Sequence, residues 1–445
     1  MKMRQATPVE NLVGEDRVHH SVYSDPRIFE QEMTHLFGRA WLLLGHESQF
    51  PNAGDYFSTR MGREPVIVTR HADGSVQVLI NRCTHRGAMV CPEGKGNAKQ
   101  FACPYHGWVF DAKGALKSVP LAQGYSEWAP DTFAKLGLAH AARVALYRGF
   151  VFASLAADGP DLAEFLGPIA SSFDDLVDRA PDGSIEIAGG VFKHAYNGNW
   201  KLVLENHLDG VHPNYVHASS VDAARAADDN PVAPGDAERY AEISLRQMRA
   251  NGASEPVWEA LGVWASEWGH GFMGDYHSDS RLVAAMNHPI FSEYRRRLEA
   301  RTGAAEADRI LNVSRFNTVV YPNVSFMSQY RQLRIVHPLA VDRTVVYTYN
   351  IRMRGAPEEM FRDTVAFSNV VNGTASWVLT DDLEIYERIQ RGLTAAMPEW
   401  VYLGRGAGRD VQEPGGFKRG ATGTSEVFIR RQFEAWRKYM AEAAA

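Results

Sequence analysis

The sequence predicts an α+β protein with two unequal domains, an all-β domain followed by a larger domain that mixes helices with an antiparallel sheet. Two observations predict this. In the first domain the runs VIVTRH and SVQVLI flank Asp73-Gly74, which is a strong hairpin signal. In the second, apolar residues alternate along three later segments, which is typical of a sheet with one buried face: FNTVVYPNVSFM, QLRIVHPL and RTVVYTYNIRM.

The first residues are expected to be helical, because apolar residues such as Met33 and Phe37 recur at helical spacing after the start signal Asp25-Pro26. The chain is therefore expected to comprise an N-terminal helical segment at 1–40, an all-β domain at 41–156 and a larger domain at 157–445.

Within the larger domain the pattern changes several times between strand and helix. The expected elements after the opening strand are a helix from about Trp200, helices and loops over 218–300, the three strands above, one long helix from about Pro357 to Gln390, a Gly-rich loop at 404–423, and a final packed helix that carries Ile429, Phe433, Trp436 and Met440 on one face.

Composition excludes several classes of protein. The 445 residues are 45% hydrophobic and 22% charged, which is ordinary for a globular chain with a sizeable core. A net charge of -6 argues against a nucleic-acid partner. No apolar run reaches the roughly 18 residues of a membrane span, and the N-terminus lacks the apolar core of a signal peptide. With only three cysteines, the chain is expected to be cytoplasmic.

The most informative residues are a Cys-x-His pair, Cys83 and His85, and a Cys-x-x-His pair, Cys103 and His106. Two thiolates and two imidazoles on two short loops suit a [2Fe-2S] cluster in which His replaces Cys on one iron. A structural zinc is the alternative, although zinc loops usually keep two residues between paired ligands. A Cys83–Cys103 disulfide would leave both histidines without a role. Cys91 is expected to be a small buried apolar residue.

A second group of polar residues lies in the segment Glu205-Asn206-His207-Leu208-Asp209-Gly210-Val211-His212-Pro213-Asn214-Tyr215-Val216-His217. Asp209 and His212 would share one face of a helix. Pro213 makes continuation of that helix difficult, so the chain is expected to fold back and bring His217 beside His212. Two imidazoles and one carboxylate form the facial triad of mononuclear non-haem Fe(II) sites. Core or helix-capping histidines remain the alternative for this segment alone.

Together these motifs resemble those of the α subunits of Rieske non-haem iron aromatic-ring-hydroxylating oxygenases. The resemblance extends over nearly the whole chain and rests on NRCTHRGAMV, CPYHGWVFDAKGAL, the Asn206–His217 segment and the late acidic pair Asp381-Asp382. It implies an all-β Rieske domain followed by a helix-grip (START-like) catalytic domain.

The resemblance also implies a role for each matched residue. Cys83, His85, Cys103 and His106 would bind the Rieske [2Fe-2S] cluster. His212 and His217 would bind mononuclear Fe(II), with Asp382 as the third ligand and Asp381 as the alternative. Asp209 would carry electrons across a subunit boundary from the cluster to the iron, and Asn206 would line the active site. His207, which would lie on another helix face, is expected to pack or form a hydrogen bond.

The implied protein is a terminal oxygenase component that uses O₂ and electrons to hydroxylate, most simply cis-dihydroxylate, a small aromatic compound. The compact N-x-x-D spacing in ENHLDGVH resembles the branch of the family that acts on benzoate-type and related substituted aromatics more than the naphthalene and biphenyl branch, and this resemblance implies a benzoate-type aromatic acid. The implied partners are an NAD(P)H-dependent reductase, with or without a ferredoxin, and a small β subunit on a head-to-tail α₃ or α₃β₃ trimer. The alternatives are a Rieske monooxygenase or demethylase with the same metals, an electron carrier without oxygenase activity, and a zinc-stabilised structural protein.

An aromatic carboxylate would favour a cationic anchor, ideally a bidentate Arg. Arg331, Arg334, Arg388 and Arg391 lie near the expected pocket strands or the acidic helix. Each is nevertheless expected to be a structural ion-pair partner, because Arg is common beside Asp and Glu. Four further residues would line the pocket or belong to the core: Phe316, Asn317, Val319 and Phe326.

Overall fold

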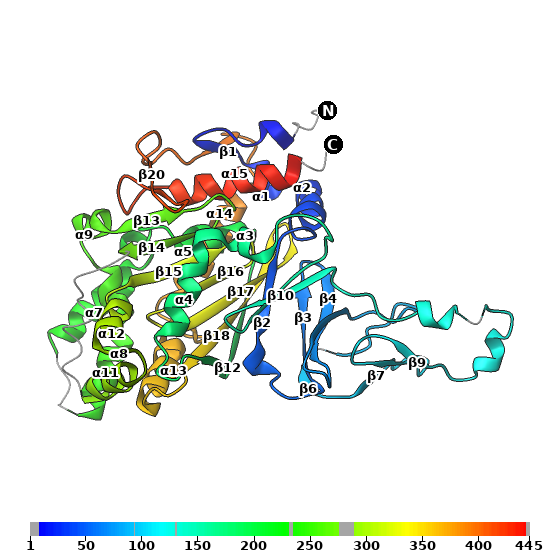
Figure 1. Ribbon diagram of the computed structural model, residues 1–445. Helices are drawn as coiled ribbons and strands as arrows, with labels where there is room; N and C mark the ends of the chain where they lie inside the picture. The colour runs from blue at the N-terminus through cyan, green and yellow to red at the C-terminus, as the bar shows by residue number, and fades with distance from the viewer. Residues whose placement is uncertain (1–8, 93, 130, 231–234, 276–288, 442–445) are drawn as a thin grey trace. The chain divides into compact units, whose positions relative to one another are not determined.

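The computed structural model describes residues 9–92, 94–129, 131–230, 235–275 and 289–441 (Figure 1). The chain forms two compact units, one of residues Leu36–Leu162 and one that combines Met1–His35 with Ala163–Ala445. The N-terminal residues therefore pack with the larger unit.

The smaller unit consists of short antiparallel strands in three sheets, in the orders β5-β4-β3-β6, β7-β8-β9 and β10-β11-β2. The strands are β2 (Leu42–His46), β3 (Asp55–Met61), β4 (Glu64–Arg70), β5 (Val76–Ile80), β6 (Lys95–Asn97), β7 (Gln100–Ala102), β8 (Val109–Asp111), β9 (Leu116–Ser118), β10 (Arg143–Tyr147) and β11 (Phe150–Ser154).

The hairpin predicted at Asp73-Gly74 is confirmed. Strands β4 and β5 pair from Arg70 opposite Val76 back to Val66 opposite Ile80. Gly74 adopts a φ of +84°, which favours glycine, and its N–H donates to the carbonyl of His71 at 2.9 Å. The chain leaves this hairpin at Ile80 and enters the loop that carries Cys83 and His85.

The larger unit is built on a nine-stranded antiparallel sheet in the order β12-β18-β17-β16-β15-β14-β13-β21-β20. Its strands are β12 (Ile185–Tyr196), β13 (Gly262–Ala265), β14 (Gly271–Asp275), β15 (Ser314–Val320), β16 (Val324–Met327), β17 (Gln332–Ala340), β18 (Arg343–Met353), β20 (Val411–Gln412) and β21 (Lys418–Arg419).

Five of these strands lie where the sequence pattern predicts strand, and four do not. Strands β13 and β14 occur inside the region 218–300, which was expected to hold helices and loops. Strands β20 and β21 lie in the Gly-rich stretch that was expected to be a loop. All four have two to five residues, too few for an alternating pattern to show, and pairing with neighbours defines them.

The helices of this unit cover the sheet, and Figure 1 shows α5 and α13 lying over it. Their bounds are α1 (Ser21–Ser24), α2 (Pro26–Gln31), α3 (Leu162–Leu166), α4 (Ala170–Asp178), α5 (Lys201–His207), α6 (Pro213–Val216), α7 (Ala218–Asp228), α8 (Asp236–Asn251), α9 (Glu255–Ala260), α11 (Pro289–Thr302), α12 (Ala304–Leu311), α13 (Glu358–Asn372), α14 (Leu379–Gly392) and α15 (Val427–Ala441).

The final helix α15 confirms its prediction, but two other helical expectations are corrected. The expected helix from Pro357 to Gln390 is two helices, α13 and α14, because Ser376 Oγ accepts from the N–H groups of Val378 and Leu379 and begins the second. The N-terminal segment is only partly helical, because strand β1 (Arg17–His19) pairs with β19 (Trp400–Tyr402).

The helix α5 is held by the buried carboxylate of Glu32 and the half-buried carboxylate of Glu205. Glu32 accepts hydrogen bonds from the residues that begin the helix, and Glu205 lies on its last turn. Tyr23 donates to Glu205 at 3.0 Å and Gln432 donates at 3.4 Å. Burial raises the pKa of Glu205 to about 7, although the bond from Tyr23 opposes the shift.

None of the described helices is both long and apolar enough to span a bilayer. The large helices instead bury one face against the sheet.

Replacing Glu205 with Gln should flatten the dependence of stability on pH. The folded-state pKa of about 7 lies above the ordinary 4.5, so the folded protein keeps a proton that the unfolded chain has released between these values. The stabilisation is complete below pH 4.5 and is lost as the pH rises through about 7, at a cost of up to about 3 kcal/mol.

Calorimetry at about pH 5 and about pH 8 measures this effect. The Glu205→Gln variant should gain in melting temperature relative to the unmodified protein only at the higher pH. Glu15→Gln, on an exposed turn, is the control and should change neither value. An equal shift at both pH values would contradict the assignment.

Candidate metal centres

The two Cys/His loops of the smaller unit share one backbone design. The carbonyl of Cys83 accepts from Gly87 N–H and that of Cys103 accepts from Gly107 N–H, each at 3.0 Å. Both glycines adopt positive φ, +76° and +68°, a conformation that side chains disfavour. Each loop therefore turns back on its own cysteine within four residues.

The four side chains of these loops converge. The Cys83 and Cys103 thiols are buried and form no disulfide. Burial raises the pKa of Cys83, and the neighbouring Cys103 thiol adds to that shift. The rings of His85 and His106 lie 4.6 Å apart, and His85 stacks on Trp108 at 4.8 Å. His85 Nδ1 is buried without a hydrogen-bond partner.

Two thiols, two imidazoles and an unpartnered ring nitrogen fit a [2Fe-2S] cluster with mixed Cys and His ligation. Cys91 is 4% exposed and belongs to the apolar core beneath the loops, as predicted.

In the larger unit, His212 and His217 come together by a different route from the one predicted. Helix α5 ends at His207, so Asp209 and His212 lie in the following turn and not on a helix. Pro213 begins the short helix α6, a position that tolerates proline because its missing N–H would have no partner there. The predicted proximity of His217 to His212 is confirmed, because the centroids of their rings lie 5.6 Å apart.

Asp382, in the first turn of α14, completes this group. Its Oδ1 lies 3.9 Å from His212 Nε2 and 3.4 Å from His217 Nε2. The three ligand atoms all lie within 4.8 Å of one another, and His217 and Asp382 are buried. With metal–ligand bonds of about 2 Å, one ion can reach all three atoms. Two histidines and one carboxylate with open positions are the ligand set of non-haem Fe(II).

Asp381 takes a different position from Asp382. Its Oδ2 lies 3.3 Å from His217 Nδ1, the ring nitrogen that faces away from the shared centre. Asp209 has the same relation to His212, with Oδ2 at 3.5 Å from Nδ1. Each histidine therefore has a carboxylate behind it, which orients the ring and leaves Nε2 for a metal.

Burial and neighbouring charged groups have opposite effects on the pKa of Asp209 and on that of His217. Burial raises the pKa of Asp209, but interaction with His212 and the backbone N–H of Val211 outweighs it, so the net pKa is lowered and the group is ionised. Burial likewise lowers the pKa of His217, but Asp382 and Asp381 together raise it above its ordinary value.

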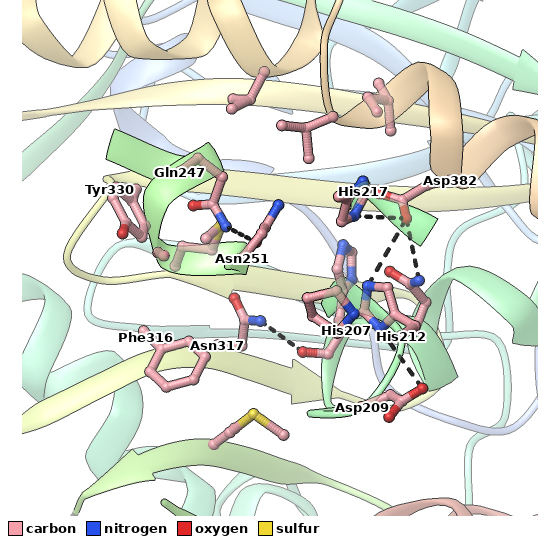
Figure 2. A pocket seen from close by; sticks show the side chains of 18 of the residues that line it. His207, Asp209, His212, His217, Gln247, Asn251, Phe316, Asn317, Tyr330 and Asp382 are labelled. Atoms are coloured by element: carbon pink, nitrogen blue, oxygen red, sulfur yellow. Dashed lines mark hydrogen bonds and ion pairs between the residues drawn. The ribbon is translucent and has the colours of Figure 1, made fainter. Parts of the chain in front are cut away.

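The candidate metal centre opens into a cavity of about 870 Å³. Figure 2 shows His212, His217 and Asp382 at one end, with Tyr330 and Phe316 toward the other. Asn206 lines the cavity and donates to Asp382 Oδ1 at 3.3 Å. Phe316 and Asn317 also line it, whereas Val319 and Phe326 are buried in the core.

Several lining residues were not identified from the sequence. His207 contributes to the wall, and burial, followed by the charge of Arg334, holds its pKa well below the ordinary value, so the ring is neutral. Helix α8 contributes Gln247 and Asn251, which hydrogen-bond to each other at 2.8 Å (Figure 2). Nothing in the α8 pattern distinguishes these amides from surface residues.

Comparison with known protein families gives two matches. Residues 178–442 match the ring hydroxylating alpha subunit (catalytic domain), and residues 40–130 match the Rieske [2Fe-2S] domain. The first match contains the metal-site segment and the second contains both Cys/His loops.

The chain is also similar to individual proteins. It is 36% identical to the toluate 1,2-dioxygenase subunit alpha of Pseudomonas putida, over 86% of this chain and 82% of that protein. It is 33% identical to the 2-halobenzoate 1,2-dioxygenase large subunit of Burkholderia cepacia, over 90% and 82%. A solved structure of naphthalene 1,2-dioxygenase with indole in the active site superposes with a TM-score of 0.80 at 28% identity, over 98% of this chain and 95% of the other.

The two adjacent aspartates of α14 should respond differently to removal of charge. Asp382→Asn should empty the metal site of the larger unit, because it removes the carboxylate that faces both Nε2 atoms. Asp381→Asn should keep the metal and weaken its binding by about 10- to 100-fold, as loss of an orienting partner does.

Metal content per chain after dialysis against graded chelator separates the two variants, and cluster absorbance reports correct folding of each. Loss of metal from Asp381→Asn with retention in Asp382→Asn would reverse the assignment.

Proposed function

This chain belongs to the ring-hydroxylating alpha-subunit family of Rieske non-haem iron dioxygenases, and we propose that it hydroxylates small aromatic acids of the benzoate type. The observation that carries the proposal is the convergence of His212, His217 and Asp382 at one end of a large cavity. An electron carrier or a zinc-stabilised structural protein needs no such second centre.

The two matched domains imply a Rieske cluster and a mononuclear iron. We assign the cluster to Cys83, His85, Cys103 and His106, in the domain at 41–156. We assign the iron to His212, His217 and Asp382, in the domain at 157–445. When bound, the cluster supplies single electrons and the iron supplies a centre for O₂ activation.

The residues around the centre have separate tasks in this proposal. Asn206 donates to Asp382 and fixes the orientation of that carboxylate. Asp381 and Asp209 hold the two imidazoles from behind. The walls of the cavity exclude bulk water and hold the ring of the substrate beside the metal ligands.

Asp209 has a second role in the proposal, which concerns assembly. About a third of its side chain, 35%, is exposed although it interacts with His212. On the cluster loop, Tyr105 is 56% exposed beside His106. We propose a head-to-tail α₃ ring, alone or with a small β subunit as α₃β₃, in which Asp209 meets His106 of the partner subunit.

The substrate class follows from the relatives and the cavity. Two similar proteins are named for toluate and 2-halobenzoate, both substituted benzoates, and both names specify 1,2-dioxygenation. We therefore propose a cis-dihydrodiol product. An NAD(P)H-dependent reductase, directly or through a ferredoxin, would supply the electrons. Three cysteines, none in a disulfide, suit the cytoplasm.

The function is tested with anaerobically purified, dithionite-reduced protein, with iron counted per chain. A Rieske-type EPR signal of low average g value and about three irons per chain are expected. Supplied with electrons and O₂, this protein should convert benzoate to a dihydrodiol. Absence of an O₂-dependent product from benzoates and neutral arenes, with both metals loaded, would contradict the oxygenase function.

Asp209→Asn should separate metal binding from turnover. The variant keeps the shape of the side chain and both sets of metal ligands, so cluster and iron content should be unchanged, while product formation is abolished. Asp222→Asn, on the exposed face of α7, is the matched control and should turn over normally. Normal turnover by Asp209→Asn would reject the electron-transfer role.

A further inference from the structure

One half-buried arginine of the cavity, Arg334, has a buried guanidinium nitrogen without a hydrogen-bond acceptor. Arg334 lies on β17, the third strand of the nine-stranded sheet, opposite Thr348 on β18. Residues two apart on a strand face the same side, so Gln332 and Arg334 point together toward the cavity, which both line. Thr348, fully buried beside them, lines it too.

The guanidinium of Arg334 is only partly satisfied by the protein. Its Nη2 donates to Gln332 Oε1 at 3.1 Å. Its Nη1 is buried and has no acceptor, and no carboxylate among the described residues forms an ion pair with it. A guanidinium removed from water without a counter-ion is unfavourable, so this arrangement favours an anionic ligand.

The other arginines considered from the sequence do not share this feature. Arg331 donates to Thr364 Oγ1 at 2.6 Å and to the carbonyl of Met360 at 3.5 Å. Arg388 forms the expected ion pair with Glu384 at 2.8 Å on the surface of α14. The expectation of a structural ion pair is therefore confirmed for Arg388. Among the described residues, no carboxylate forms an ion pair with Arg331, Arg334 or the exposed Arg391, so the expectation is wrong for these three.

Gln332 adds a second unpartnered donor. Its Oε1 accepts from Arg334, which fixes the orientation of the amide, because a guanidinium can only donate. Its Nε2 is then left buried without an acceptor. Two unpartnered N–H groups on the same face of one strand suit the two oxygens of a carboxylate.

Arg334 also acts on the residues of the metal end of the cavity. Its charge lowers the pKa of His207, after the larger effect of burial. Burial lowers the pKa of Arg334 itself, and Tyr386 and Asp382 oppose that shift. Arg334 and the metal-site residues Asp382 and His212 line the same cavity, so an anion bound to Arg334 would share that cavity with the candidate metal centre.

We propose that Arg334, oriented by Gln332, binds the carboxylate of the substrate and selects aromatic acids over neutral arenes of the same size. The proposal rests on the oxygenase function above and adds the residue that determines its specificity. Arg246 is the rival anchor on the cavity wall. It is exposed and lies over the Tyr330 ring at 5.2 Å, so water already solvates its charge.

The test compares benzoate with nitrobenzene, which has nearly the same shape and no charge. Calorimetric binding and kcat/KM are measured for both compounds with the metal-loaded protein. Arg334→Met should lose about 30- to 1,000-fold on benzoate, as loss of a buried charged partner does, and change little on nitrobenzene. Arg334→Lys keeps the positive charge but loses the bidentate geometry of the guanidinium, so its affinity for benzoate should fall about tenfold.

Two further variants serve as comparisons. Arg388→Met removes a surface charge from α14 and should leave binding and kcat/KM unchanged for both benzoate and nitrobenzene. Arg246→Met should reduce benzoate binding less than Arg334→Met does. Iron content and melting temperature verify that each variant is folded. If Arg334→Met does not fold, the comparison of benzoate with nitrobenzene is made with Arg334→Lys.

Three results would overturn the proposal. These are equal losses on benzoate and nitrobenzene, unchanged benzoate binding by folded Arg334 variants, and a larger loss from Arg246→Met. Failure of the oxygenase function would be recognised separately, because the unmodified protein would then convert neither compound while calorimetry still reported whether Arg334 binds benzoate.

Discussion

The position of the segment Asn206–His217, which carries two of the candidate metal ligands, depends on one buried carboxylate. The side chain of Glu32 has no exposed surface and accepts from Lys201 Nζ at 2.5 Å, Trp200 Nε1 at 2.9 Å and Trp436 Nε1 at 2.7 Å. These donors belong to the start of α5 and to α15, so one charge joins three segments that are distant in sequence. A buried ion pair is stable only when its remaining hydrogen bonds are made, and here both oxygens of Glu32 are engaged. The far end of α5 then presents Asn206 and His207 to the cavity.

The candidate metal centre of the larger unit contains the same histidine–carboxylate arrangement twice. His212 and His217 differ in their local backbone, yet each has a carboxylate near Nδ1 and directs Nε2 toward Asp382. An acceptor behind the ring fixes the tautomer that leaves Nε2 free, and it makes that nitrogen a better ligand. The acidic pair of α14 is therefore divided between two tasks, because consecutive residues of a helix point in different directions.

The parts of the fold and site that could be predicted from the sequence are those set by local chemistry. Asp73-Gly74 predicts its hairpin because few residues tolerate positive φ. The Cys-x-His and Cys-x-x-His spacings predict two loops whose side chains lie together, and the structure brings the His85 and His106 rings within 4.6 Å of each other. The short strands β13 and β14 could not be predicted, because partners in the sheet define them. Likewise no local signal shows that Arg334 lacks an acid to pair with, since its environment is assembled from strands and helices far apart in the chain.

The size of the cavity has a consequence for the range of compounds that can react. Its volume of about 870 Å³ lies toward the upper end for pockets that hold small molecules, roughly 300–1,000 Å³, whereas a single-ring acid fills only a fraction of it. Phe316 and Tyr330 line the end of the cavity away from His212, His217 and Asp382 (Figure 2). Substituents of the substrate ring that point toward Phe316 and Tyr330 would displace water there without moving the ring carbons that face the candidate metal ligands. A family of substituted acids could then share one orientation and one position of attack.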